Sequence, residues 1–381
     1  MKHIALLFLL LIFLQRDGWA EDLDCRQSWM PADAPVFCPW RSETVLPEPR
    51  AYHAAATYNG RIYVLGGLRY DAETGAVIYY DSAVSATIGL DGRLNSWVNE
   101  PSFNDSRSGA ASAASDKCVF LVGGSSSRGT SVKYFDDLQY AHILDNGRLS
   151  RWTRAASHLN VPRSNLSLVV FKEARGTFLS AVAGVTQIGD DTVHLDTVEV
   201  ARVHEDCSTG DWKIADYHLK GGRSSPQALI DHNTMIVIGG WGDLDGIDVY
   251  NDVQTTALRS DGSPGPWRTA ANRLVTGIYG HATTLAIPGS GINSSVLLSV
   301  AGEIGSGAYA NWISFAYVSD SQPYPDAIGA WQIAGTGKLP DGRAGIAVIQ
   351  SGDRLYVIGG SNANGKYYKD VVSSQIDWGH R

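Results

Sequence analysis

Several hallmarks of common protein classes are missing from this 381-residue sequence. It has no cluster of Lys or Arg and a formal net charge of −8, which argues against nucleic acid or an anionic membrane surface as its ligand. No segment reaches 18 consecutive apolar residues, which argues against membrane insertion. Neither G-x-S-x-G nor H-E-x-x-H occurs, so serine-hydrolase and zinc-peptidase chemistry have no support.

Cysteine is scarce, with four residues in the whole chain. Cys25 and Cys38 bracket a short N-terminal segment, and we expect them to form a disulfide with each other. Cys118 and Cys207 fall in adjacent sequence repeats and could also pair, but three connectivities are open, and Cys118 could instead be a buried thiol.

No group of metal-ligating residues stands out. Asp243, Asp245 and Asp248 have a calcium-like spacing but lack the remaining ligands of an EF-hand loop, so we expect solvated acids there. His53 and His281 occupy equivalent places in two repeats, where a shared metal is the alternative to packing near the axis. The favoured expectation is no metal and no cofactor.

A continuous apolar stretch lies at the start of the chain. Residues 4–14 follow a positively charged N-terminus and precede Gly18-Trp19-Ala20, a pattern typical of a cleaved secretory signal. We therefore predict a signal peptide over residues 1–20, one domain over residues 21–381, and a secreted or periplasmic location. The oligomeric state is left open.

A short apolar strand that ends in a pair of small residues recurs six times, and a Trp follows each of the first five pairs after about 28 residues. The second members of the pairs are 57, 60, 56, 62 and 58 residues apart. A period near 50 residues without helix signals is typical of a β-propeller, in which each repeat forms one four-stranded blade. We therefore predict an all-β, six-bladed propeller. The pairs are Gly66-Gly67, Gly123-Gly124, Ala183-Gly184, Gly239-Gly240, Ala301-Gly302 and Gly359-Gly360.

Each repeat is consistent with four strands. The first begins near an Arg and is rich in small residues, and the second is a continuous apolar run such as Ile62–Leu65, which indicates burial on both faces. The third follows an Asp or Asn, and the fourth carries the Trp, which we expect to pack between blades. The sixth repeat lacks a fourth strand, and Phe37–Trp40 resembles one without a repeat of its own. We predict that this N-terminal segment completes the last blade and closes the ring.

These features together resemble the Kelch repeat. The resemblance rests on the Gly-Gly after an Ile-Tyr-Val-Leu strand, the following Asp, the spaced Trp and the Arg ahead of the first strand. Four copies match well, and two are degenerate because Ala183 and Ala301 replace the first Gly. Kelch proteins have β-propeller folds, so the resemblance implies six blades.

Five arginines are expected around the axial opening, because the turn into each first strand lies on the same face as the loop after each small pair. In the fifth repeat, Ile278 takes the place of the Arg. One interpretation is that each guanidinium bonds carbonyls or a carboxylate of the next blade. The other is that several of them bind an anionic ligand. The five are Arg50, Arg107, Arg163, Arg223 and Arg343.

The loops on this face are rich in aromatic and acidic residues, a composition that suits a sugar-binding cleft and also a protein-binding surface. Trp241 and Glu303 directly follow their small pairs, and we expect both to face the opening. Tyr309, His53 and His281 complete the candidate ligand-binding residues. Tyr80 and Tyr250 belong to predicted third strands and are expected in the core.

The chain also resembles, in part, the exported sialic acid mutarotases, which are six-bladed Kelch proteins. In these enzymes, a Glu directly after a small-Gly pair and an Arg six residues later are implicated in catalysis. Here Glu303 follows Ala301-Gly302, but Tyr309 stands in the place of the Arg. The leading hypothesis is a binding module for a glycan or a protein. The alternative is a sugar mutarotase that uses Glu303 as general acid and base, with Arg223 or Arg343 holding the sugar carboxylate.

Overall fold

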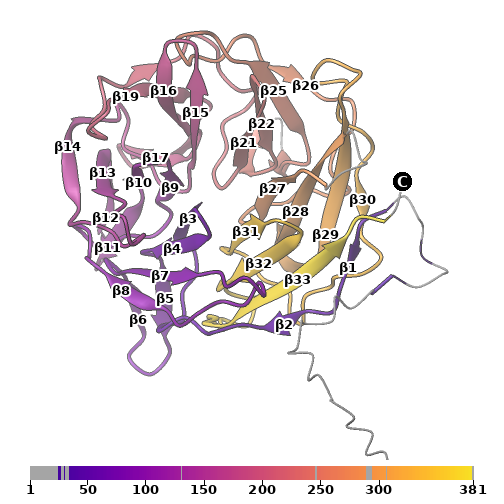
Figure 1. Cartoon of the computed structure of the whole chain (residues 1–381). Coiled ribbons are helices and arrows are strands. Elements are labelled where there is room, and N and C mark those ends of the chain that lie inside the picture. Colours follow the sequence, from indigo (N-terminus) through magenta and orange to yellow (C-terminus); the bar gives the residue numbers. More distant parts are fainter. Residues whose placement is uncertain are drawn as a thin grey trace, which may run out of the picture.

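Six β-sheets surround a central axis in the computed structural model, which describes residues 25–26, 30, 34–129, 131–244, 247–288, 294–305 and 307–379 (Figure 1). The elements of this part of the chain are all strands, which confirms the predicted six-bladed propeller. Among the described residues, no helix exists that could cross a membrane. The predicted signal peptide over residues 1–20 lies outside the described residues.

Every blade is an antiparallel sheet of consecutive strands, and the first strands of neighbouring blades meet around the axis. Blade 1 consists of β3 (Ala54–Tyr58), β4 (Arg61–Leu65), β7 (Ala83–Thr87) and β8 (Val98–Glu100). Blade 2 consists of β9 (Ala111–Ala114), β10 (Cys118–Val122), β13 (Asp137–His142) and β14 (Thr153–His158). Blade 3 consists of β15 (Ser167–Glu173), β16 (Gly176–Val182), β19 (Val198–Val203) and β20 (Lys213–Ile214).

The remaining blades follow the same order. Blade 4 consists of β21 (Gln227–Asp231), β22 (Thr234–Ile238), β25 (Val253–Ala257) and β26 (Arg268–Thr269). Blade 5 consists of β27 (Ala282–Ala286), β28 (Ser294–Ile304), β29 (Ala308–Ser319) and β30 (Gln332–Ile333). Blade 6 contains β31 (Ala347–Ser351), β32 (Arg354–Ile358) and β33 (Val371–Asp377).

In blades 1 to 4, a small two-stranded hairpin follows the second strand. In blade 5, β28 and β29 themselves extend into this region, so that Glu303 lies on a strand. The four hairpins are β5 (Leu68–Asp71) with β6 (Ala76–Tyr79), β11 (Ser125–Arg128) with β12 (Ser131–Tyr134), β17 (Val185–Ile188) with β18 (Asp191–His194), and β23 (Trp241–Leu244) with β24 (Ile247–Val249).

The N-terminal segment closes the ring, as the sequence predicts. Strands β1 (Val36–Phe37) and β2 (Arg41–Ser42) both pair with β33, so the first and last parts of the chain share one sheet (Figure 1). The predicted disulfide between Cys25 and Cys38 is formed. This arrangement covers the edge of β33 that would otherwise be exposed.

The hydrophobic core is divided into six clusters, each shared by two neighbouring blades. Trp152 shows the pattern: it precedes β14 of blade 2 but packs with Tyr63 of blade 1, and its ring meets Phe103 edge-on at 5.8 Å between centroids. Its indole nitrogen also donates to the carbonyl of Pro101. The repeated Trp therefore joins adjacent blades, because a buried indole removes on the order of 200 Å² from water.

Two rings of backbone hydrogen bonds also join the blades. In the outer belt, the second glycine of each small pair donates its N–H to the carbonyl at the Arg position of the next blade, and all six bonds form at 2.8–2.9 Å. The inner belt runs through the residue two positions after the Arg and has five bonds among the described residues. The sixth bond, in which the N–H of Gly280 in blade 5 would donate to the carbonyl of Ser225 in blade 4, is not formed between these two described residues.

The backbone geometry at the outer belt explains why each pair consists of small residues. At the second position, φ lies near +95 to +110°, and a Cβ at Gly124 would meet the carbonyl oxygen of Ser108 at 2.9 Å. The first position also has a positive φ, yet Ala183 and Ala301 occupy it with φ of 57 and 52°. Glycine is therefore required at the second position, whereas alanine is tolerated at the first.

Candidate functional site

The five arginines lie inside their own blades, which differs from the expectation that they line the opening. Arg107 is fully buried, donates to the carbonyl of Gly123 and forms a two-pronged ion pair with Asp137, with Nη–O distances of 2.6 and 3.2 Å. The ring of Phe135 covers its guanidinium at 3.9 Å. The equivalent arginines are equally buried, and their polar partners are Ser82 for Arg50, Glu199 for Arg163, Asp252 for Arg223 and Asp370 for Arg343.

The reason for this burial is the carbonyl that ends each second strand. It points into the blade, and the Arg satisfies it. An acid neutralises the guanidinium in four blades, whereas Ser82 is the side-chain partner of Arg50. Neither sequence interpretation described this arrangement, since the side chains bond within their own blade. The acids could have been found, because Asp137, Asp252 and Asp370 recur 27–30 residues after their arginines.

Blade 5 replaces the whole ion pair, not the Arg alone. Ile278 stands at the Arg position, and Trp312 stands where Asp137 stands in blade 2. Both side chains belong to the same hydrophobic cluster. A buried ion pair is therefore exchanged for an apolar contact, a change that such sites accept at little cost.

His53 and His281 are buried and do not face the opening. Burial lowers the pKa of each imidazole to about 3, and Arg50 contributes to the lowering at His53. A Cβ at Gly359 would meet His53 at 3.0 Å, and one at Gly239 would meet His281 at 3.0 Å. The two rings thus pack in different junctions, of blades 6 and 1 and of blades 4 and 5, and do not converge on one metal.

A ring of bridged residue pairs surrounds the axis on this face. In each blade, the residue after the Arg position forms an antiparallel bridge with the residue after the small pair. In five blades, the first partner is Ala or Ser, and in blade 5 it is Tyr279, opposite Glu303. The bridges are Ala51–Leu68, Ser108–Ser125, Ser164–Val185, Ser224–Trp241, Tyr279–Glu303 and Ala344–Ser361.

Glu303 is surrounded by three tyrosines, two from its own blade and one from blade 1. Burial, and then the hydrogen bond to Glu303, raise the pKa of Tyr279 well above its ordinary value. Burial, and then the charge of Glu303, raise the pKa of Tyr309 to about 12. Burial also raises the pKa of Tyr52, with smaller contributions from Tyr309 and Glu303. These phenols therefore stay protonated at neutral pH, and Tyr279 and Tyr309 are available as donors to the Glu303 carboxylate.

Tyr52 has an unusual backbone conformation. Its φ is 51°, a left-handed value that is uncommon for a bulky residue, and other repeats carry Gly, Asn or Ser at this inner-belt position. Its ring lies against Gly345, where a Cβ would meet it at 3.0 Å. Tyr52 therefore extends from blade 1 over the glycine of blade 6, and the strain at this point favours a role in the site.

Trp241 provides a second aromatic surface beside this cluster. It is 41% exposed, which confirms that it reaches solvent after its small pair. Its ring meets His194 edge-on at 4.7 Å and lies 6.2 Å from the ring of Tyr279 at an angle of 31°. An aromatic row thus runs from blade 3 through blade 4 to Glu303. We call the opening with Tyr52, Trp241, Tyr279, Glu303 and Tyr309 the mouth.

Sequence reasoning identified Glu303, Trp241 and Tyr309 but missed Tyr279 and His194. The signal for Tyr279 was present, because it is a bulky residue at a position where the other five repeats have Ala or Ser. His194 ends the β17–β18 hairpin, and nothing in the sequence pattern marks it as a neighbour of Trp241.

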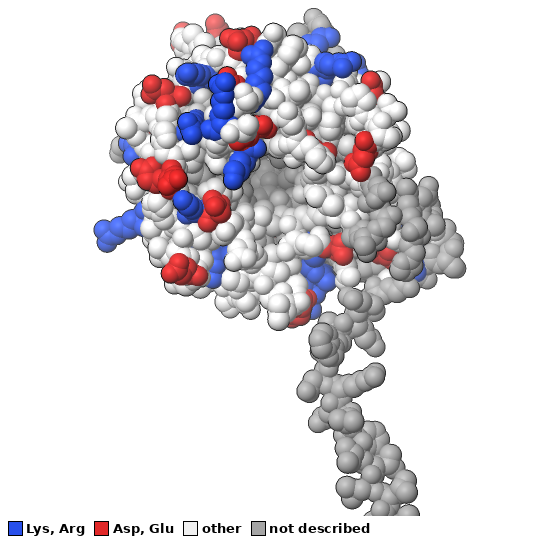
Figure 2. Space-filling view, turned by 45° about the horizontal axis from the view of Figure 1, so that its top comes forward, with Lys and Arg blue, Asp and Glu red and all other residues white. Residues whose placement is uncertain are grey.

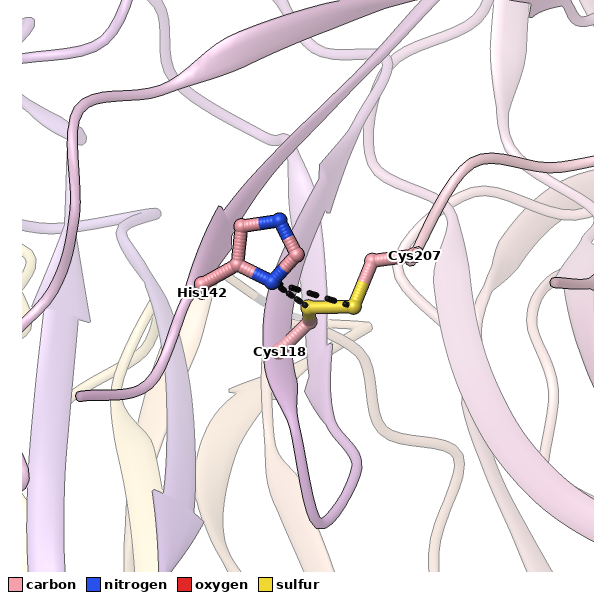
Figure 3. Close-up of side chains that lie close together, drawn as sticks. All are labelled: Cys118, His142 and Cys207. Atoms are coloured by element: carbon pink, nitrogen blue, oxygen red, sulfur yellow. Dashed lines mark hydrogen bonds between the residues drawn. A yellow bond between two sulfur atoms is a disulfide. The ribbon is translucent and has the colours of Figure 1, made fainter. Parts of the chain in front are cut away.

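One group of potential metal ligands lies away from the mouth. Cys118, His142 and Cys207 bring ligand atoms within 4.8 Å of one another (Figure 3). The two cysteines form a disulfide between blades 2 and 3, and His142 Nδ1 lies 3.3 and 3.7 Å from their sulfurs. Since thiolates are what bind metals, the disulfide removes this group as a metal site. Of the two alternatives for Cys118, the structure shows pairing.

The chain is a six-bladed β-propeller, with a candidate site at one end of its axis. Residues 49–86, in blade 1, match the family model of the Kelch motif, which confirms the resemblance seen in the repeats. The match extends from the residue before Arg50 to the third strand.

Solved structures are similar to the whole ring. The structure of YjhT superimposes with a TM-score of 0.64 and 15% sequence identity, covering 88% of this chain and 99% of that chain. At this identity, the similarity establishes the fold alone, and 534 chains share it, so function has to be argued from the site. No curated protein matches the sequence significantly.

Proposed function

We propose that the protein binds a glycan at the mouth. Aromatic rings stack on the C–H faces of sugars, the Glu303 carboxylate accepts hydrogen bonds from hydroxyls, and the protonated phenols of Tyr279 and Tyr309 donate them. The observation that carries the proposal is the placement of Tyr52 and Tyr279. Both stand at ring positions where the other repeats have small residues, and both lie beside Glu303.

The charges around the mouth favour a neutral sugar. Arg223 and Arg343, the sequence candidates for holding a sugar carboxylate, are fully buried and paired with Asp252 and Asp370. Glu303 adds a negative charge, which repels an anionic ligand.

A glycan array followed by calorimetry tests this proposal. We expect the wild-type protein to bind a neutral oligosaccharide, and Trp241→Ala to weaken binding roughly tenfold or more, because the stacking surface is lost. Tyr217→Ala is the matched control, since Tyr217 is similarly exposed at 37% but lies away from the mouth. Absence of binding to every glycan on the array would contradict the proposal and point to a protein ligand.

A mutarotase activity is the second candidate, and the two phenols beside Glu303 favour it. A carboxyl group with two phenols beside it has the groups needed to move a proton between ring oxygen and anomeric hydroxyl. NMR exchange spectroscopy on glucose, galactose and N-acetylneuraminate measures this directly. We expect faster anomer exchange, abolished by Glu303→Gln. An exchange rate equal to that in buffer would rule out the enzyme while leaving glycan binding open.

We also propose that the protein is exported. The two disulfides, one of them within the N-terminal segment, are consistent with an oxidising compartment. Mass spectrometry of the secreted or periplasmic fraction should find a mature chain that begins at Glu21. A protein that keeps its first 20 residues in the cytoplasm would contradict this.

A further inference from the structure

A pocket of about 560 Å³ lies between blades 3 and 4, on the face opposite the mouth. The strand directions place it there: β16 ends at Ala183-Gly184 on the mouth face, and the pocket is built around its beginning at Phe178. The other walls are the ends of β19 and β20 and the loop between β25 and β26. Its volume falls within the range of small-molecule sites, roughly 300–1,000 Å³.

The floor of this pocket is apolar and preformed. Phe178, Val200 and Ala215 form it and are buried. Phe171 stacks on Phe178 with 6.0 Å between centroids, and the bare backbone of Gly262 lies on the same ring, where a Cβ would come within 2.5 Å. The loop of blade 4 is thereby packed against blade 3, so a ligand would meet a shaped surface.

The rim of the pocket carries exposed cations. They come from four separate segments, and Arg259 pairs with Asp216 at 3.7 Å. Among the described residues, no ion pair is formed by the other three. The acid Asp261 accepts hydrogen bonds from Ser263, which lower its pKa, and the charge of Arg175 makes a smaller contribution in the same direction. The four cations are Arg175, Arg202, Lys213 and Arg259.

The surface view agrees with this gathering of charge. Figure 2 shows several Lys and Arg side chains in the upper left of the visible face, with Asp and Glu side chains among them, whereas much of the remaining surface there is uncharged. The lining holds these four cations and three acids, Asp211, Asp216 and Asp261, so it has a small positive excess, whereas the chain as a whole has a net charge of −8. Exposed and unpaired cations around an apolar floor attract ligands that combine both properties.

We propose that this pocket binds a small aromatic organic anion. The ring of the ligand would lie on Phe178, Val200 and Ala215, and its anionic group would accept hydrogen bonds from Arg202 and Lys213. These two residues are close together by register, since Arg202 pairs with Phe178 and Lys213 pairs with Val200. The site is independent of the mouth and of the function proposed for it.

Fluorescence titration with anilinonaphthalene sulfonate, an aromatic anion, provides the test. We expect saturable binding to the full-length mature protein, weakened roughly tenfold by the double variant Arg202→Gln/Lys213→Gln. The neutral analogue phenylnaphthylamine should bind weakly to both proteins. Lys117→Gln and Lys369→Gln, which change exposed cations in blades 2 and 6, are the matched controls and should bind as the wild type does.

The double variant should keep its unfolding temperature, because neither side chain is buried or ion-paired. Ala215→Trp, which fills the floor, is a second variant and should abolish binding of the sulfonate, while Trp241→Ala should not affect it. Equal weakening by the control variants, or unchanged binding in both Arg202→Gln/Lys213→Gln and Ala215→Trp, would overturn the proposal.

Discussion

At the scale of single residues, buried arginine side chains satisfy backbone carbonyls that would otherwise lack a hydrogen-bond donor. The five arginines are the largest fully buried side chains of the described protein, and each caps a strand-ending carbonyl. Removing one partner leaves an unpaired buried charge, a change that costs about 3–5 kcal/mol at comparable sites. Blade 5 shows that replacing both partners is tolerated, through Ile278 and Trp312.

This contrast gives a prediction for blade 2. Arg107→Met should destabilise the protein by about 3 kcal/mol, because the Gly123 carbonyl loses its donor and Asp137 keeps only the half-exposed Arg154 as a cationic partner. The double variant Arg107→Ile/Asp137→Trp, which copies blade 5, should recover part of this loss. Urea unfolding measures both. A single variant as stable as the wild type would show that the ion pair is not structural.

The buried histidines predict acid sensitivity. The folded-state pKa of His281 is about 3, below its ordinary value of 6.5, so the neutral imidazole stabilises the fold above pH 6.5 and this contribution is lost as the pH falls toward 3. At pH 4.5 the loss is roughly 2–3 kcal/mol for each such His. His281→Leu should therefore narrow the stability difference between pH 7 and pH 4.5, measured by thermal unfolding. If the stability difference between the two pH values is the same in His281→Leu and the wild type, the low pKa of His281 is contradicted.

Sequence reasoning worked unevenly at this scale. Trp241 was predicted to face the opening because it directly follows its small pair, and its ring is partly exposed and lies beside Tyr279. The arginines were placed on the correct face but in the wrong environment, because sequence alone does not show which way a side chain points from a turn. Comparison of the repeats with one another would have exposed both Tyr279 and the paired change at Ile278 and Trp312.

At the scale of strands and turns, the small pairs determine how blades attach. Gly124→Ala should destabilise by more than about 2 kcal/mol, because φ is 95° and the new Cβ would meet Ser108 O and Ala110 within 3 Å. Gly123→Ala should cost less, since Ala183 and Ala301 occupy this position with a positive φ, although the backbone must shift because the new Cβ would meet the carbonyl oxygen of Arg163 at 2.6 Å. Denaturant midpoints of the two variants give the comparison, and equal losses would contradict the distinction.

Strands were the level at which the sequence was most informative. The period of the small pairs predicted six blades, and the apolar run of each second strand predicted burial on both faces, because both signals are local. The small hairpins β5–β6, β11–β12, β17–β18 and β23–β24 were not predicted. Their sequences vary, and their pairing depends on the loop geometry that the blades impose.

At the scale of the whole molecule, closure depends on the N-terminal segment. Deleting residues 21–45 removes β1 and β2 and leaves β33 unpaired on one side. We expect loss of cooperative unfolding and self-association through this edge. Size-exclusion chromatography and hydrogen exchange over 371–377 measure the two effects.

The control for that deletion is Cys25→Ser/Cys38→Ser, which keeps the strands and removes the cross-link. It should remain a closed ring and lose about 3 kcal/mol, the effect of opening a loop of this size. A deletion variant that elutes as this control does, with the same protection from hydrogen exchange over 371–377, would show that the segment is dispensable.

The missing bond of the inner belt predicts that local opening is easiest between blades 4 and 5. Blades 4 and 5 are held at the axis by one fewer bond than other neighbours, and Trp241 and Tyr279 stand on opposite sides of that junction. A sugar stacked on both rings would bridge blades 4 and 5 at the junction that has one inner-belt bond fewer than the others. Occupancy of the mouth should then slow amide exchange at Gly280, the donor of the missing bond, more than at the five bonded amides of the inner belt.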